Sequence, residues 1–421
     1  MSPITKSSSA VILALTLFSI SLSAQSHKCG TMSHFQHRVS ADPTCHTRMQ
    51  ETEARIQQWL QQQGKSNRAE STITIPVVVH VVWHEAVENI SDQQILSQIQ
   101  ILNEDFQLLN EDSLEESHPF WNASSNTGIE FCLASQDPDG NPTNGITRTY
   151  TDVVSFNGND GNEKKTANGG KDNWDPTQYL NIWVCNLNAS GSTLGYATFP
   201  SELASAPEED GVVIRYQAFG NMGTAEAPND KGRTATHEVG HWLNLRHIWG
   251  DANCGDDFVA DTEPAETDNS GCPEFPYNPN NSCGSGPNGE MFMNYMDYVD
   301  DACMNMFTSG QAERMNAAIN TERAAILNST GCNKSTRVAE SEVSAFALYP
   351  NPSNGFITIQ CVQSGLDKLG LYDALGNLIY EKSMNDQKFF QLELEHFSNG
   401  IYFVEMSGGK FKTAQKLVLI R

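Results

Sequence analysis

The sequence predicts an α/β domain followed by a small all-β sandwich, and three observations support this prediction. A β-branched run at 73–83 (ITIPVVVHVVW) is typical of a buried strand, and a segment with helical spacing of its apolar residues follows it. Strand-like and helix-like segments then alternate as far as about residue 333, as they do in α/β domains. From residue 340 onward, short alternating runs are separated by Asn-Pro, Asn-Gly and Gly-Gly turns, the pattern of a sandwich.

Two segments precede the α/β domain. Residues 1–24 combine the positive Lys6, an apolar stretch at 11–22 and a small-residue exit, which predicts a cleaved secretory signal. An uncleaved membrane anchor is the alternative, although the stretch is shorter than the roughly 18 apolar residues of a membrane span. Residues 25–68 are polar, with a Gln-rich stretch at 51–63 that is typical of a helix and a basic end. We therefore expect a removable pro-segment.

The α/β domain is expected at 69–333 and begins with the strand at 73–83. A helix follows at 91–109, where Ser91 and Gln94 have the spacing of a capping box. The other elements expected in this domain are strands at 128–134, 179–185 and 212–216 and a closing helix at 309–328.

A linker at 334–344 leads to the all-β domain at 345–421. Its expected strands are the runs FALYP, FITIQC, KLGLYD, LIYEK, FFQLEL, GIYFVEM and KLVLI. No cluster of residues in this domain has the pattern of a catalytic site.

The chain is strongly acidic, with 51 acidic residues against 26 basic ones and a formal net charge of −25. This balance argues against nucleic-acid binding, which needs clustered Lys and Arg to neutralise phosphates. The acidic excess is also local, because residues 251–301 contain no Lys or Arg. Bound calcium or a cationic substrate would balance this segment, and a solvated acidic loop is the alternative.

Ten cysteines fit an extracytoplasmic protein, because disulfides persist outside the cytosol. Four of them lie within one fifty-residue window that overlaps the acidic segment, at Cys254, Cys272, Cys283 and Cys303. Spacing alone does not determine how these four pair.

The segment His237-Glu-Val-Gly-His241 has the spacing of a zinc site on a helix. Residues four apart share one face, so both imidazoles can bind one ion while Glu238 stands beside it as the catalytic base. His247 cannot continue that face, so the chain must turn, and Asn244 is a residue type that tolerates the left-handed conformation of such a turn. Three histidines with an open fourth position are typical of catalytic zinc.

HEVGHWLNLRH resembles the extended zinc motif of the metzincins, with Asn244 in place of their glycine, and MNYMDY at 293–298 resembles their Met-turn. Further matches to the pappalysin family, in particular its ulilysin-like bacterial branch, lie at 179–187, 195–200, 259–264 and 293–308. The resemblance covers roughly residues 70 to 330. It implies a metzincin-like catalytic domain with a mixed sheet and an active-site helix.

The resemblance also implies roles for individual residues. Tyr298 would donate to the oxyanion of the reaction, and Met296 would form a structural base beneath the metal. Asp301 would be the acidic floor of the S1′ pocket and select Arg or Lys after the scissile bond, with Asp300 as the alternative. The strand residues that would pair with an extended substrate are Gly195, Tyr196 and Ala197.

The acidic segment resembles a calcium-stabilised, disulfide-pinned loop of the same branch. Its candidate calcium ligands are Asp251, Asp256, Asp257, Asp261 and Thr262. The implied disulfides pair Cys254 with Cys283 and Cys272 with Cys303.

Lys28-Cys29-Gly30-Thr31 resembles the Cys-Gly element with which some metzincin pro-segments fill the fourth zinc position, which implies latency. A disulfide between Cys29 and Cys45 is the alternative. Removal of the segment near Arg68 would then activate the enzyme.

The all-β domain resembles the C-terminal sorting domain of type IX secretion cargo. LYPNP at 348–352, LYDALGNLIYE, NGIYFVEM and a final KLVLIR carry this resemblance. It implies export through the outer membrane of a Gram-negative bacterium of the Bacteroidetes group by the type IX machinery. An immunoglobulin-like spacer or sugar-binding module is the alternative.

Together these features predict a secreted or surface-bound zinc endopeptidase with calcium support, acting on proteins or peptides, with no nucleic-acid partner and no transmembrane segment in the mature chain. One alternative is a secreted binding or adhesion protein with a structural zinc site, against which Glu238 argues because such a site needs no carboxylate beside its ligands. Another is a zinc hydrolase that acts on something other than peptides.

Overall fold

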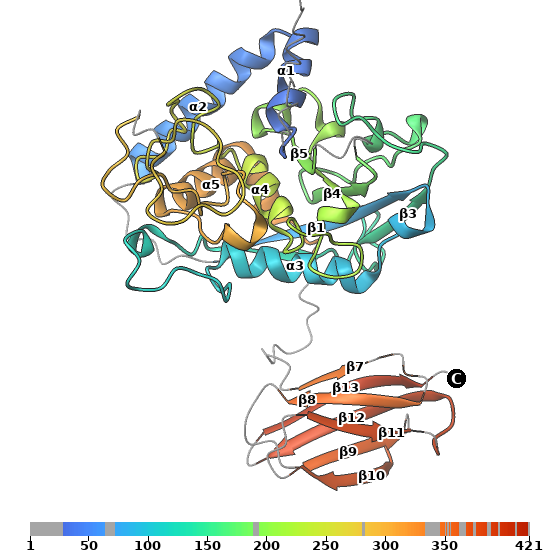
Figure 1. Cartoon of the computed structure of the whole chain (residues 1–421). Coiled ribbons are helices and arrows are strands. Elements are labelled where there is room, and N and C mark those ends of the chain that lie inside the picture. Colours follow the sequence, from blue (N-terminus) through green and yellow to red (C-terminus); the bar gives the residue numbers. More distant parts are fainter. Residues whose placement is uncertain are drawn as a thin grey trace, which may run out of the picture. The chain divides into compact units, whose positions relative to one another are not determined.

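Figure 1 shows the computed structural model, which describes residues 28–63, 72–187, 193–279 and 283–332 and most of 346–419. The chain divides into two compact units, Met1–Asn333 and Lys334–Arg421, at the point where the linker was expected to begin. The expected secretory signal, the basic end of the pro-segment and the linker lie outside the described residues. Among the helices that are described, none has the length and apolar character needed to cross a membrane.

A mixed sheet forms the framework of the larger unit, as predicted. Its central strand β1 (Ile73–Trp83) pairs in parallel with β2 (Ile129–Leu133), β3 (Ile146–Tyr150) and β4 (Leu180–Cys185). Residues of β1 are buried on both faces of the sheet, which explains its continuous apolar run. The short, polar β3 was not predicted, because its ITRTY sequence lacks an apolar face.

The other side of the sheet ends in the strand that borders the site. β4 pairs in parallel with β6 (Val212–Arg215), and β5 (Gly195–Ala197) pairs antiparallel with β6 and forms the edge. The residues expected to form the substrate-pairing strand, Gly195 to Ala197, therefore do form a strand, and it lies at the edge of the sheet.

Helices α3 (Asp92–Phe106) and α4 (Arg233–Trp242) pack against the sheet and share one apolar core with it (Figure 1). Ser91 accepts a hydrogen bond from the Gln94 backbone N–H and caps α3, as predicted. A capping box also needs a hydrogen bond from the Ser91 backbone N–H to the Gln94 side chain. This part of the prediction is wrong. The Gln94 side chain donates instead to the Phe219 carbonyl at 2.8 Å, because the chain after β6 folds over this helix start.

Two helices precede the sheet in the chain, and α5 (Ser309–Glu322) follows α4. α1 (Thr31–Ala41) was not predicted, and α2 (Thr44–Gln63) begins before the expected helix at 51–63. The closing helix is α5, whose expected last turns form a separate 3₁₀ segment. The 3₁₀ segments of the unit are Ala86–Glu88, Trp121–Ala123, Asn162–Lys164, Thr166–Asn168, Pro200–Glu202, Pro207–Glu209, Tyr216–Ala218, Asp301–Cys303 and Ala324–Asn328.

The smaller unit consists of two antiparallel sheets around one apolar core, as predicted. The four-stranded sheet has the order β10-β9-β12-β13, and the three-stranded sheet has the order β11-β8-β7. Their bounds are β7 Phe346–Tyr349, β8 Phe356–Cys361, β9 Lys368–Asp373, β10 Leu378–Ser383, β11 Phe389–Glu393, β12 Gly400–Gly408 and β13 Phe411–Leu419. Each expected run of this domain forms one of these strands.

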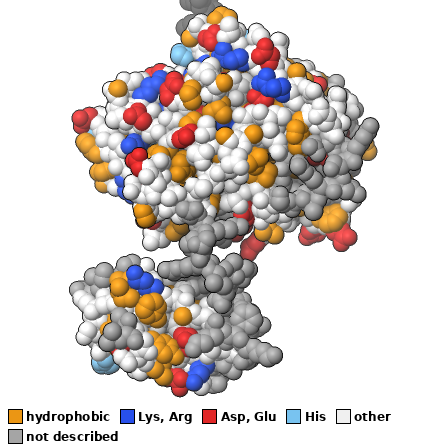
Figure 2. All heavy atoms as spheres, turned by 180° about the vertical axis from the view of Figure 1, so that it is seen from behind, with side chains coloured by type: hydrophobic (Ala, Val, Ile, Leu, Met, Phe, Trp, Pro, Cys, Tyr) orange, Lys and Arg blue, Asp and Glu red, His pale blue; other side chains and the backbone are white. Residues whose placement is uncertain are grey.

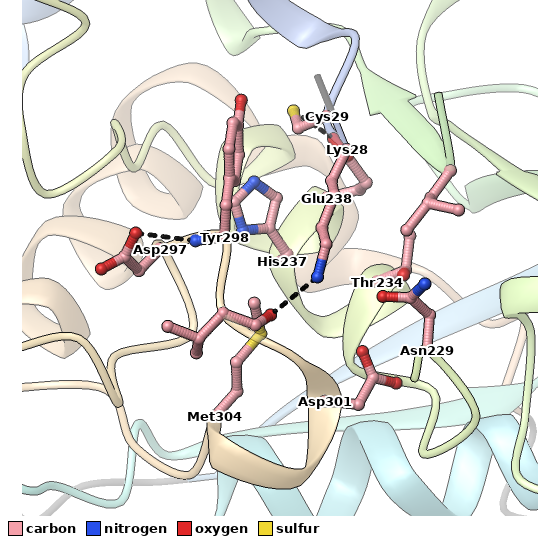
Figure 3. Close-up of a pocket in the computed structure, with 12 residues that line it drawn as sticks. Lys28, Cys29, Asn229, Thr234, His237, Glu238, Asp297, Tyr298, Asp301 and Met304 are labelled. Carbon is pink, nitrogen blue, oxygen red and sulfur yellow. Dashed lines mark hydrogen bonds between the residues drawn. The ribbon is translucent and has the colours of Figure 1, made fainter. Parts of the chain in front are cut away.

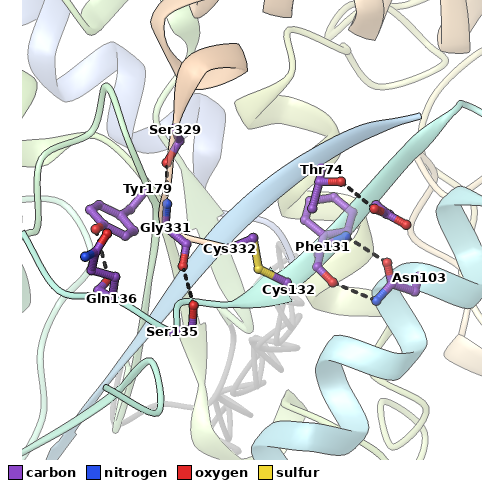
Figure 4. The surroundings of a disulfide bond; sticks show 11 residues. Thr74, Asn103, Phe131, Cys132, Ser135, Gln136, Tyr179, Ser329, Gly331 and Cys332 are labelled. Carbon is purple, nitrogen blue, oxygen red and sulfur yellow. Dashed lines mark hydrogen bonds between the residues drawn. A yellow bond between two sulfur atoms is a disulfide. The ribbon is translucent and has the colours of Figure 1, made fainter. Parts of the chain in front are cut away.

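Three disulfides join described residues of the larger unit. Cys254 is bonded to Cys283 and Cys272 to Cys303, which are the pairs that the resemblance implied. The third, Cys132–Cys332, was not predicted and ties β2 to the chain that leaves the unit (Figure 4). Beside it, the Gly331 carbonyl accepts from the Ser135 N–H at 2.8 Å.

Cys29, Cys45 and Cys185 are free and buried. The alternative of a disulfide between Cys29 and Cys45 is therefore wrong.

The strongly acidic composition does not make every face of the larger unit acidic. On the face seen in Figure 2, Lys and Arg side chains lie close to Asp and Glu side chains. Ion pairs such as Arg55–Glu322 and Arg148–Asp92 join opposite charges in the larger unit.

Candidate active site

The start of helix α4 is anchored by a buried ion-pair network. The Arg233 guanidinium bonds the carboxylates of Asp105 at 2.6 Å and Asp112 at 2.9 Å, and it also donates to the Tyr295 hydroxyl. The Thr236 hydroxyl donates to the same Asp105. These contacts hold the first turn of α4 against α3, so the residues that follow Thr236 have a fixed orientation.

Three histidines converge from this helix and the loop after it. The Nε2 atom of His241 lies 3.1 Å from Nε2 of both His237 and His247. Each Nδ1 has a separate partner: the Tyr295 carbonyl for His237, the Leu245 carbonyl for His241 and the Asp251 carboxylate for His247. With Nδ1–H donating outward, the three Nε2 lone pairs face one point, which is the arrangement of a histidine metal site.

The turn between His241 and His247 has the predicted geometry. Asn244 has a φ of 69°, so the left-handed conformation expected for this residue is confirmed. Beneath the histidines, Met296 packs against Gly240, where an added Cβ would lie 2.5 Å from the Met296 sulfur. Gly240 is therefore required by the close approach of the Met296 turn to the helix.

Glu238 is fully buried beside the histidines. Its Oε2 accepts from the Thr31 hydroxyl at 2.7 Å and from the Cys29 thiol at 3.4 Å, whereas its Oε1 has no hydrogen-bond partner among the described residues. Burial raises the Glu238 pKa to about 8. A buried carboxylate oxygen without a partner is expected where a further molecule, such as water, completes the site.

The donor set fits a zinc ion. The Cys29 sulfur and one nitrogen each of His237, His241 and His247 lie within 4.8 Å of one another, and all four residues are buried. Burial lowers the pKa of His237 to about 3 and also lowers that of His241, which favours neutral imidazoles. Neutral imidazoles and one thiol in a compact group are typical ligands of Zn²⁺.

The segment 28–31 lies along the free edge of β5. The Leu194 N–H donates to the Lys28 carbonyl and the Gly30 N–H donates to the Gly195 carbonyl, each at 2.8 Å. This pairing is parallel, and the Ala197 N–H donates to the Thr31 hydroxyl. The segment therefore occupies the edge of β5 while it presents Cys29 to the histidines.

The three β5 residues do not contribute in the same way. Gly195 and Ala197 make backbone bonds toward the edge, whereas the Tyr196 side chain points to the other face of the sheet and donates to Glu163. Backbone pairing of Gly195, Tyr196 and Ala197 with a substrate stays a prediction.

A pocket next to the histidines holds the Lys28 side chain (Figure 3). The Lys28 ammonium donates to Asp300 at 2.8 Å and to the Val299 carbonyl at 3.3 Å. Asp301 lines the same pocket, is 1% exposed, and accepts from the Lys231 and Arg233 N–H groups with one oxygen. Both predicted acidic candidates thus lie near the pocket. Of the two, Asp300 is the one that the Lys28 ammonium contacts.

Tyr298 stands against two of the three histidines. Its ring centroid lies 4.9 Å from that of His247 and 5.7 Å from that of His237. Asp297, before it in the chain, is buried and accepts from the N–H groups of Asn269 and Tyr298. Ring contacts with the histidines and a backbone hydrogen bond to Asp297 thus fix the position of Tyr298 at the site.

The five candidate calcium ligands do not form one cluster. Asp251 bonds His247, and Asp261 accepts from the Thr308 hydroxyl and the Gly310 N–H at the start of α5. Thr262 donates to Asp257 at 2.8 Å, and Asp256 accepts from a neighbouring N–H. Within the described residues, the group of His, Cys, Asp and Glu side chains close enough to share an ion is the one at the histidines. Calcium binding stays a prediction.

Sequence comparisons agree with this geometry. The family model described as pregnancy-associated plasma protein-A (peptidase M43) matches residues 160–320. "Extracellular metalloprotease 1" of Coccidioides posadasii is 31% identical over 265 residues, which cover 61% of this chain and 81% of that protein. The chain belongs to the M43 peptidase family.

Solved structures support the same assignment of this M43 peptidase. Mirolysin in complex with a compound is 53% identical, with a TM-score of 0.59, and the match covers 61% of this chain and 97% of that one. A variant of Tannerella forsythia promirolysin is 48% identical, with a TM-score of 0.65, and the match covers 72% and 97% of the two chains. This chain is therefore a zinc metalloendopeptidase.

A second family model, the secretion system C-terminal sorting domain, matches residues 347–420. The M43 peptidase is thus a secreted or cell-surface protein of a Bacteroidetes-type Gram-negative bacterium, and its sorting domain directs it to the secretion machinery.

Several residues at the site of the M43 peptidase were not predicted from the sequence. Thr31 was quoted only as part of a motif, yet it bonds Glu238, and Lys28 enters the pocket. The anchor residues Asp105 and Arg233 are far apart in the chain, and only their contact reveals a role. Gly240 carried a usable signal, because it lies inside the zinc helix, where glycine is unfavourable.

Proposed function

We propose that this M43 peptidase cleaves peptide bonds before Arg or Lys and is made as a latent zymogen. The observation that carries this proposal is the group formed by Cys29, the three histidines and Glu238, which lies beside a pocket that already holds a lysine side chain. His237, His241 and His247 would hold Zn²⁺, which when bound supplies Lewis-acid polarisation and lowers the pKa of water.

Glu238 is the general base in this proposal. Its free Oε1 is placed to accept the proton of the attacking water, and its raised pKa suits passing that proton to the leaving amine. Tyr298 is placed to donate its hydroxyl proton in a hydrogen bond to the carbonyl oxygen as negative charge develops there.

The edge of β5 would position the substrate. Its Gly195 carbonyl and Ala197 N–H, which now bond the segment 28–31, would instead bond the backbone of an extended peptide. Lys28 supports a basic residue at this position, because its own basic side chain lines the pocket and bonds Asp300. Arg is longer and forked, so it would reach past Asp300 to the more deeply buried Asp301.

Chain direction explains how Lys28 and Cys29 can occupy the site without being cleaved. In the pro-segment the pocket residue, Lys28, precedes the residue at the histidines, Cys29. In a substrate the order is reversed, because the carbonyl at the metal belongs to the residue before the one in the pocket. The pro-segment therefore runs opposite to a substrate, and Cys29 takes the position of the attacking water while Thr31 binds the base.

The test of the reaction uses the zinc-loaded, full-length protein after maturation. Peptides with Arg, Lys, Leu or Asp after the scissile bond should be cleaved before Arg and Lys only. The Glu238→Gln variant should bind zinc and lose about 1,000-fold in kcat, in the range for loss of a general base. Glu313→Gln, an exposed change on α5, is the control. Cleavage by zinc-bound Glu238→Gln at the wild-type rate would refute the assigned base.

Latency is tested by two cysteine variants of the unprocessed protein. Cys29→Ala should be active without removal of the pro-segment, whereas Cys45→Ala, which changes the other free, buried cysteine of the pro-segment, should stay latent. Equal latency of both variants would show that the thiol at the histidines does not block the site.

A further inference from the structure

The turn after β5 contains a buried carboxylate whose direct counter-charge comes from the pro-segment. Glu202, in the turn Pro200–Glu202, is 2% exposed, and its Oε1 lies 2.5 Å from Nε of Arg38 on α1. Apart from this ion pair, neither carboxylate oxygen has a hydrogen-bond partner in the described parts of the chain. The hydroxyl of the adjacent Ser201, 6% exposed, is also without a partner there.

The neighbouring charges do not replace Arg38. Glu209 also pairs with Arg38, and it has its own cation in Lys165 at 2.7 Å. Lys164 attracts the Glu202 carboxylate electrostatically, but its ammonium donates its hydrogen bond to the Glu209 carbonyl. Removal of the pro-segment therefore leaves Glu202 unpaired in a site shaped around a guanidinium, which is unfavourable for a buried carboxylate.

Glu202 lies on the line that the pro-segment follows across the site. Thr31 bonds Glu238, Phe35 packs edge-on against Phe199, and Arg38, one turn further along α1, reaches Glu202. Phe199 also contacts the His241 ring. The Glu202 site is thus continuous with the zinc site along the chain after β5.

The reversed direction of a substrate decides which of its residues would reach Glu202. A substrate with its basic residue in the Lys28 pocket runs antiparallel to β5, so the residues before the scissile bond extend past Ala197 toward Phe199. With one substrate residue opposite each residue of β5, the Glu202 turn lies at about the third to fifth residue before that bond.

We infer that Glu202, flanked by Glu209, forms a second specificity site in the mature enzyme, which binds an arginine side chain of the substrate on the N-terminal side of the scissile bond. The inference rests on the proposed peptidase function. Arginine fits better than lysine, because Arg38 bridges both carboxylates with different nitrogens of its fork. The pro-segment fills this site and the S1′ pocket at the same time.

The test compares matched peptides with the matured, full-length enzyme. All peptides carry Arg after the scissile bond, and each carries either arginine or its neutral analogue citrulline at one of the successive positions before that bond. Mass spectrometry verifies the site of cleavage. At one position, arginine should raise kcat/KM over citrulline on the order of tenfold, as expected for a charged hydrogen-bonded pair.

Two variants assign this preference. Glu202→Gln should bring the arginine-to-citrulline ratio close to one, whereas Glu208→Gln, on the exposed side of the neighbouring turn, should keep it. Because the ratio is measured within one enzyme, a loss of active protein does not change it, and the wild-type scan needs no variant.

The contrary outcomes are distinct. Cleavage of all peptides by the wild type without preference at any position would overturn the second site alone, as would a ratio that survives in Glu202→Gln. If the wild type cleaved none of the peptides, the proposed peptidase specificity would fail, and the second site with it.

Discussion

At the residue scale, the site depends on a few side chains whose surroundings give ordinary groups special properties. Glu238 is a common carboxylate, but burial raises its pKa, and its Oε1 has no hydrogen-bond partner among the described residues. Glu202 and Asp301 are likewise buried acids that need a cation or several donors. Variants of these three buried acids therefore test the proposed roles most directly.

The two acids near the pocket should separate recognition of arginine from that of lysine. Asp301→Asn is expected to lower kcat/KM for cleavage before Arg by about tenfold or more, because the buried fork loses its charged partner. Asp300→Asn should act mainly on cleavage before Lys, since the Lys28 ammonium bonds Asp300. Kinetics on two peptides that differ only at this residue measure both effects. An unchanged preference in Asp301→Asn would show that this residue is not the floor.

Asp297 should make stability fall as pH rises. Burial raises its pKa in the folded state to about 7, well above its unfolded value, so the folded protein holds a proton that the unfolded chain releases. Its contribution is complete below about pH 4 and is lost as pH approaches about 7, by up to about 4 kcal/mol. Urea unfolding of the wild type and Asp297→Asn across this range measures the difference. A pH dependence identical in both would contradict this prediction.

At the element scale, the zinc helix and its turn combine local and distant constraints. Helical spacing places His237 and His241 together, whereas the chain reverses at Asn244 to bring in His247. The helix start is held by Asp105 of α3 and its end by the Met296 turn, which touches Gly240. Elements that are distant in sequence therefore fix the orientation of a helix whose own sequence carries the ligands.

The conformation of Asn244 leads to opposite expectations for two substitutions. Asn244→Gly should keep zinc affinity and stability, because glycine adopts a positive φ without strain. Asn244→Val should destabilise the protein by about 1–3 kcal/mol and weaken zinc binding, since a β-branched residue is strained there. Thermal unfolding and competition for zinc with a chelator measure these effects. Equal behaviour of the two variants would indicate that the turn tolerates other conformations.

At the scale of the whole molecule, a disulfide closes the larger unit. Cys132–Cys332 joins residues 200 positions apart and fastens the end of the unit to β2 (Figure 4). The disulfide therefore holds the last described residues of the larger unit against β2.

Removing this disulfide should lower stability without removing activity. Cys132→Ala combined with Cys332→Ala is expected to reduce the free energy of unfolding by about 2–4 kcal/mol, mainly because the unfolded chain gains freedom. The disulfide contains none of the residues of the histidine site, so kcat/KM at 25 °C should stay near the wild-type value. Calorimetry and peptide cleavage of the same samples test both parts. An unchanged Tm would refute the stabilising role.

Patterns that act over a few residues were sufficient to predict part of this protein. The helical period of HEVGH, the left-handed tolerance of Asn244, the apolar run of β1 and the alternating runs of the smaller unit all act over a few residues. The fold class, the two units, the family and the identity of the ligand-bearing helix followed from such patterns.

The tertiary structure brings together residues whose contact no short-range pattern predicted. It paired Cys132 with Cys332, placed Lys28 in the pocket beside Asp301 and brought Arg38 to Glu202. It also directs the Gln94 side chain to the Phe219 carbonyl and not to the helix start, and it pairs the calcium candidate Asp261 with Thr308. The physical reason is that burial and pairing of charges depend on packing between elements, and no local pattern in the sequence records that packing.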